Sequence, residues 1–139
     1  MQKTHEVTES AKNGDRLTFC LELPWPAPAL SPNARGHWST LARAKKAYRT
    51  RCRAIAGVGA PLLCEALQRP PERLEVALIF VPPDRRARDL DNLLAAMKSG
   101  LDGLADALGV DDSKWRIKIE MADETTKGGL VLVEVGVPS

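Results

Sequence analysis

The spacing of the apolar residues changes several times along this chain, and these changes constrain the fold more than any other feature. Apolar and polar side chains alternate, or form a β-prone apolar run, as in half-buried or buried strands over residues 16–23, 74–81, 117–121 and 130–135. Apolar residues recur every three or four positions over 40–56 and from about 90 to 108, which is typical of amphipathic helices. The element order is therefore βαβαββ. This order predicts a two-layer α/β (α+β) domain, with a mixed sheet and helices packed on one face.

Glycine and proline residues set the expected ends of these elements. The stretch from Gly57 to Pro61 predicts a break after the first helix, and Gly109 is placed to end the second. A turn at Lys127-Gly128-Gly129 predicts that the last two strands form a terminal hairpin.

The chain length and composition predict one folded domain. The 139 residues are 44% hydrophobic and 27% charged, an ordinary globular composition. Residues 1–15 are almost wholly polar, which predicts a flexible tail before a folded domain at 16–139. No apolar run has the length of a membrane span and no secretory signal is recognisable, so we expect a cytoplasmic protein without a membrane partner.

Positive charge is concentrated in one segment, although the whole chain has a formal net charge of only +2. Residues 23–64 contain no Asp or Glu. The cationic residues of this segment are Arg35, Arg43, Lys45, Lys46, Arg49, Arg51 and Arg53. This asymmetry favours a surface for a polyanion, whose condensed counterions are released when lysine or arginine reaches a phosphate. The alternative is an ordinary solvated helix face.

Two carboxylates lie at the predicted start of the second helix. Asp89 and Asp91 follow a strand and stand among Arg85, Arg86 and Arg88. Side chains two residues apart share a face only where the chain is extended, so a site using both aspartates predicts a helix that begins at or after Asp91. Such hard oxygen ligands suit Mg²⁺ or Mn²⁺. Alternatively, Asp89 caps the helix and Asp91 complements its positive end.

A second acidic pair, Asp111 and Asp112, follows the second helix. A straight helix would carry this pair roughly 25–30 Å from Asp91. To meet Asp91, the pair must come from a neighbouring protomer, or the helix must end early and turn back; otherwise it forms an ordinary acidic turn. Lys98 lies two turns beyond Asp91 on nearly the same face, where it could approach a phosphate or be a plain surface lysine. Trp25 and Trp38 are candidates for stacking on bases, with Trp25 alternatively a packing residue.

Several motifs resemble, in their order, the RusA family of Holliday-junction resolvases. They are Leu21-Glu22-Leu23-Pro24-Trp25-Pro26, Ala47-Tyr48-Arg49, Asp84-Arg85-Arg86-Ala87-Arg88-Asp89-Leu90-Asp91-Asn92-Leu93, Asp111-Asp112 and Thr126-Lys127-Gly128-Gly129. The resemblance implies a homodimer that cuts four-way DNA junctions with Mg²⁺ held by Asp89, Asp91 and Asp112, which converge in the folded dimer. The family's functional lysine falls at Ala95 here, so Lys98 is the candidate to replace it.

The function implied by the resemblance is a structure-selective endodeoxyribonuclease in DNA recombination and repair, in a bacterial or phage-infected cell. Metal-assisted hydrolysis would use Asp89, Asp91, Asp112 and Lys98. The DNA backbone would be held by Arg43, Lys45, Lys46, Arg49, Arg53, Arg85, Arg86 and Arg88. The alternatives are a branched-DNA-binding accessory protein without catalysis and a hydrolase of small phosphate esters.

Overall fold

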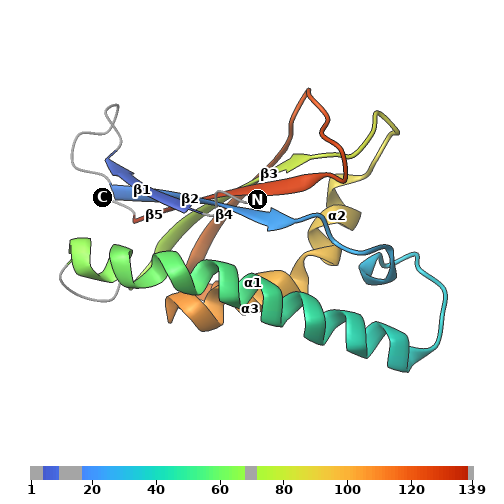
Figure 1. Cartoon of the computed structure of the whole chain (residues 1–139), viewed down its shortest axis with the longest axis horizontal. Coiled ribbons are helices and arrows are strands. Elements are labelled where there is room, and N and C mark those ends of the chain that lie inside the picture. The colour runs from blue at the N-terminus through green and yellow to red at the C-terminus, as the bar shows by residue number, and fades with distance from the viewer. Residues whose placement is uncertain (1–4, 10–16, 68–71, 138–139) are drawn as a thin grey trace.

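A mixed sheet forms one layer of the protein in the computed structural model, which describes residues 5–9, 17–67 and 72–137 (Figure 1). The strands, in chain order, are β1 (His5–Glu9), β2 (Leu17–Pro24), β3 (Leu74–Val81), β4 (Trp115–Met121) and β5 (Leu130–Gly136). Their spatial order is β1-β2-β5-β3-β4. Strands β3 and β4 run parallel, and the other neighbours are antiparallel.

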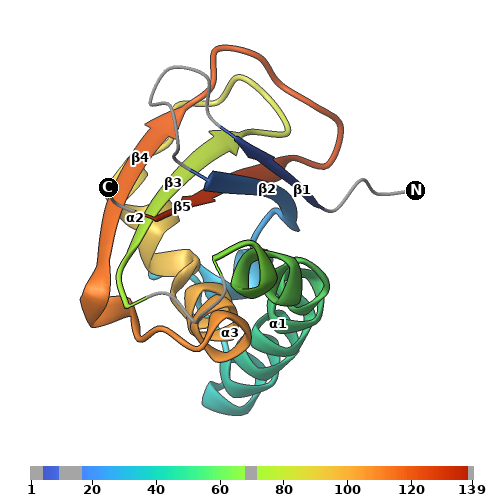
Figure 2. The same ribbon diagram turned by 90° about the vertical axis from the view of Figure 1, so that its left-hand side faces the viewer.

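The helices form the second layer. They are α1 (Trp38–Leu67), α2 (Leu90–Ala96) and α3 (Lys98–Leu108), with short 3₁₀ turns η2 (Pro28–Leu30) and η3 (Asp112–Lys114). Figure 2 shows α1 and α3 side by side on one face of the sheet. The predicted α+β class, with helices packed against a mixed sheet, is therefore confirmed.

The core lies between these layers because the strands present alternate apolar side chains to the helices. On β3, Leu74, Val76, Leu78 and Phe80 are buried, whereas the residues between them are half-buried. The valines of the neighbouring strand β5 are also fully buried, at positions 131, 133 and 135. This alternation is the sequence pattern that predicted the strands.

Two glycines let α3 approach α1 closely. A Cβ added at Gly103 would collide with the backbone carbonyl of Arg49, and one at Gly100 would meet the ring of Tyr48 at 2.5 Å. The Tyr48 hydroxyl donates a hydrogen bond of 2.6 Å to the Pro24 carbonyl and so ties α1 to the end of β2. Burial raises the pKa of Tyr48, and it raises the pKa of the Cys52 thiol to about 12.

The helix boundaries differ from those predicted. Helix α1 continues through Gly57 and Pro61 to Leu67, so the expected break is wrong. Ala56 and Ala60 are buried in this stretch, and such packing overrides weak local propensity. The predicted second helix is two helices, which meet at Met97, whereas the expected end at Gly109 is confirmed by its left-handed φ of 73°.

Two strand predictions also need correction. His5–Glu9 pairs with β2, so the predicted tail at residues 1–15 contains a strand. Residues 1–4 and 10–15 of the predicted tail lie outside the described structure. The expected terminal hairpin is wrong because β5 lies between β2 and β3, and β4 lies beyond β3. Strand β5 lies inside the sheet and its three valines are buried, whereas β4 lies at the edge and has no buried residue.

Within the described residues, no helix is long and apolar enough to cross a membrane.

Candidate functional site

The two aspartates near the start of α2 have separate positions. Asp89 has extended dihedral angles and caps the helix, because its carboxylate accepts a hydrogen bond of 2.9 Å from the Asp91 backbone N–H. The helix begins at Leu90, which places the exposed Asp91 in the first turn. The condition for a shared site, a helix beginning at or after Asp91, is therefore not met, and the capping interpretation of Asp89 is confirmed.

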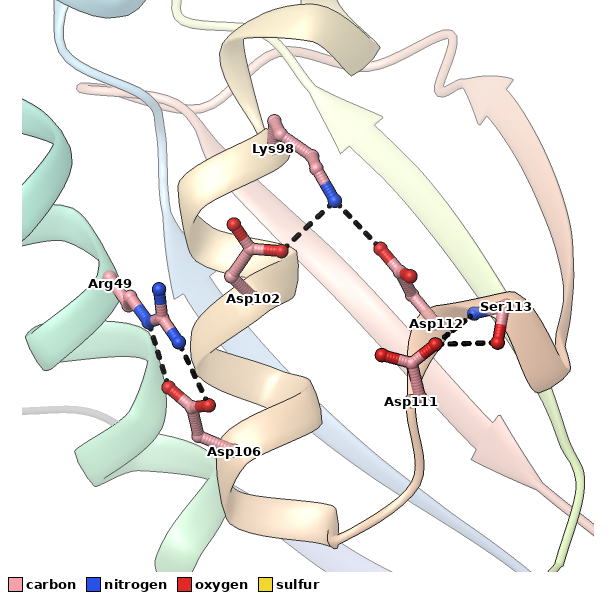
Figure 3. Close-up of polar contacts among 7 residues, drawn as sticks. All are labelled: Arg49, Lys98, Asp102, Asp106, Asp111, Asp112 and Ser113. Atoms are coloured by element: carbon pink, nitrogen blue, oxygen red, sulfur yellow. Dashed lines mark hydrogen bonds and ion pairs between the residues drawn. The ribbon is translucent and has the colours of Figure 1, made fainter.

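Lys98, at the start of α3, joins two acidic residues (Figure 3). Its ammonium group donates to Asp112 at 2.8 Å and to Asp102 at 3.0 Å. These hydrogen bonds, first that to Asp112, raise the pKa of Lys98. Asp112 thus meets Lys98 within one chain because α3 ends at Gly109 and the chain turns back, so no second protomer is needed for this contact.

A cavity of about 660 Å³ brings together some of the predicted site residues. Asp91, Lys98 and Asp112 line it, as do Lys45 and Asp102, but Asp89 does not. The sequence interpretation missed Asp102, although its position four residues after Lys98 on a helix is the spacing of a neighbouring ion pair. It also missed Asp106, which binds Arg49 from 57 positions away and left no local signal.

The described side chains do not fit the predicted magnesium site. Among the side chains that the structure describes, those of residues 18–61 and 72–137, no group of three or more His, Cys, Asp or Glu is arranged to hold a metal ion. Asp89 is used as a helix cap, and the Lys98 ammonium occupies one oxygen of Asp112. Binding of Mg²⁺ or Mn²⁺ by Asp89, Asp91 and Asp112 stays a prediction from sequence.

The cations predicted to hold DNA fall into two groups. In the first group, side chains are paired: Arg49 forms a two-point ion pair with Asp106, at 2.8 and 3.0 Å, which lowers the pKa of Asp106. Arg88 pairs with Asp84 at 2.8 Å, and its guanidinium lies 5.6 Å from the centre of the Trp25 ring. Arg86 lies 3.6 Å from the same Asp84 carboxylate.

The second group is exposed and makes no ion pair with a carboxylate of the described residues. It comprises Arg43, Lys45, Lys46, Arg53 and Arg85, together with Arg51. Four of the five residues that the sequence predicted from the first helix, all except Arg49, are therefore available to an external anion.

Comparison with known proteins identifies a family without assigning an activity. No family model matches the chain. A protein of Xylella fastidiosa (strain Temecula1 / ATCC 700964), which bears the name "Uncharacterized protein", is 36% identical over 136 residues, or 97% of this chain and 87% of the relative. The chain therefore belongs to the same family as this Xylella protein.

Among solved structures, the OmpA-like domain of FopA1 from Francisella tularensis subsp. tularensis SCHU S4 matches 99% of this chain and 84% of its own. Its sequence identity is 16% and its TM-score is 0.41, a degree of likeness from which we draw no function.

These comparisons correct the assignment to the RusA family. No family model matches the chain, and the relative that shows its family bears only the name "Uncharacterized protein". The predicted endodeoxyribonuclease activity and the role in recombination and repair depended on that resemblance, so they are corrected with it.

Proposed function

We propose that this protein binds DNA through the phosphate backbone, using the cationic first half of α1. One observation carries the proposal: Arg43, Lys46 and Arg51 are exposed and unpaired with any described carboxylate, in a segment from residue 23 to 64 that contains no acidic residue. Unpaired cations gathered on one element attract a polyanion and release its counterions. An ordinary solvated helix face is the alternative, and measuring DNA binding after charge reversal on α1 distinguishes the two.

The helix also gives the cations a regular spacing. Lys46 and Arg53 are seven residues apart, hence on nearly the same face and about 10 Å apart along the helix axis. That separation is close to three base-pair steps of about 3.4 Å along the axis of duplex DNA. Contacts of this kind position a protein on DNA without reading its sequence.

The kind of DNA is left to experiment. A four-way junction was implied only by the corrected resemblance, so the proposal concerns the phosphate backbone, and a junction serves as one probe. A homodimer also stays a proposal.

Strand β4 lies at the sheet edge, where the strand of a second copy could pair with it. Sedimentation equilibrium would test this by measuring whether the mass is that of one chain or of two.

The proposal is tested by reversing two charges on α1. The variant Arg43→Glu/Lys46→Glu is compared with wild type for binding to a labelled linear duplex and to a four-way junction, by fluorescence anisotropy over a range of salt concentrations. We expect weaker binding to both, and a salt dependence of log K reduced by about 0.9 for each phosphate contact that is lost.

A matched control reverses two exposed cations on β4, Arg116→Glu/Lys118→Glu, which changes the net charge equally. These residues alternate with Ile117, which lines the cavity on the helical side, so they lie on the opposite face of the sheet. The control should bind DNA nearly as wild type does. If both variants lose DNA affinity equally, the loss reflects net charge alone and the proposal is overturned. Unchanged DNA binding by the α1 variant would overturn it too.

A further inference from the structure

A second pocket lies beside the cationic half of α1, where the chain enters the helix. It has a volume of about 300 Å³ and is lined by residues 29–32 and 34–37 together with Trp38, Leu41 and Lys45. Leu30, Lys45 and Ala95 also line the larger cavity, so the two hollows adjoin. None of the residues lining the smaller pocket is acidic, whereas Arg35 and Lys45 are cationic.

Trp38, which lines this pocket, is the most exposed large apolar residue among those that the structure describes. The side chain of Trp38 is 74% exposed. The other two tryptophans are packed: Trp25 meets the ring of Phe80 edge to face, and the Trp115 indole N–H donates to the Val110 carbonyl. Trp38 therefore presents an indole face to solvent at a position where packing does not use it.

The neighbouring imidazole is held in place beside this indole. The His37 Nδ1 atom lies 2.6 Å from the Ser39 hydroxyl and accepts from the Ser39 backbone N–H at 3.2 Å. These contacts leave the His37 ring centre 5.4 Å from that of Trp38, with the planes inclined by 34°. Two aromatic rings thus lie next to each other in a pocket that two cations also line.

We infer that this pocket takes an unpaired nucleobase of DNA, stacked on Trp38, with Arg35 and Lys45 near the flanking phosphates. A flat ring on an aromatic face and cations for the backbone are the two elements of single-strand recognition. A base inside a duplex has both faces stacked and cannot enter such a site unless it is extruded. The volume lies at the lower end of small-ligand pockets, which fits one nucleotide. The inference rests on the proposed function and names its preferred substrate as DNA with unpaired bases.

The test compares Trp38→Ala with Trp38→Phe, using an oligothymidine strand and a blunt duplex of the same length as probes. Removal of the indole should weaken binding of the single strand by about ten-fold, since one stacked base contributes on that order. Trp38→Phe should keep most of the affinity, and neither variant should change duplex binding or the salt dependence, because no charge is lost. Val58→Ala, another exposed apolar position on α1, is the matched control and should bind both probes normally.

Intrinsic fluorescence gives a second measurement that needs no alanine variant. Oligothymidine should quench the emission of the wild-type protein, and the quenching should be largely absent in Trp38→Phe. Equal quenching in both proteins, or equal loss of single-strand and duplex affinity in Trp38→Ala, would overturn the inference. Failure of the Arg43→Glu/Lys46→Glu test would instead overturn the proposed function, so the two failures are distinguishable.

Discussion

Lys98 and Arg43 carry the same charge in different surroundings. Lys98 lies between Asp102 and Asp112, and Arg49 and Arg88 are likewise matched to Asp106 and Asp84. On the first half of α1, Arg43, Lys46 and Arg51 are exposed and form no ion pair with a described carboxylate. A cation that is already paired stabilises its own fold, whereas an unpaired one is available to a ligand.

The largest expected change in stability comes from disturbing the close packing of α3, which carries Asp106, against α1, which carries Arg49. Gly103→Ala places a Cβ against the Arg49 carbonyl, so we expect the free energy of unfolding to fall by about 3 kcal/mol, measured in urea. Gly57→Ala is the matched control, because nothing lies within 4 Å of an added Cβ there. That substitution in an exposed helical position should stabilise by about 0.5–1 kcal/mol. Equal effects at both glycines would contradict close packing of α1 on α3.

A smaller change in stability should distinguish the paired Arg88 from the unpaired Arg85 in the same loop. Arg88 is 12% exposed and donates to the carbonyls of Asp84 and Arg86, so Arg88→Ala should destabilise by about 1–2 kcal/mol. Arg85, three residues earlier, is exposed, and Arg85→Ala should change stability by less than about 0.5 kcal/mol. Urea unfolding and DNA anisotropy are measured on both. A loss of DNA affinity in Arg88→Ala at unchanged stability would break the comparison.

The smallest effect is the pH dependence of the ion pair between Arg49 and Asp106. Arg49 holds the pKa of Asp106 below its ordinary value, so the pair contributes stability above the unfolded pKa, near 4, and loses it as the pH falls through the lower folded pKa. The difference in unfolding free energy between wild type and Asp106→Asn should thus be full at neutral pH and shrink below about pH 4. In an Arg49→Met background most of this pH dependence should be lost, leaving only the smaller effect of Arg53 on the pKa of Asp106. A difference that is the same at neutral and acid pH would exclude the pair as its cause.

The layers of this protein were readable from the sequence because burial follows local periodicity. The alternation in residues 74–81 predicted the strand whose Leu78 and Phe80 are fully buried. The absence of acidic residues from 23 to 64 predicted a cationic surface, and Arg43, Lys46 and Arg51 are exposed there because the segment offers no carboxylate of its own.

Which charges meet across the fold was decided by tertiary structure alone. Asp106 neutralises Arg49 from 57 positions away, and Asp112 reaches Lys98 only because the chain turns back after Gly109. The place of β5 between β2 and β3 likewise depends on which strands pair, and the alternation within each strand does not specify its neighbours. Periodicity along a sequence determines which residues face inward, but it cannot say which distant residue lies opposite, because that depends on how the layers pack.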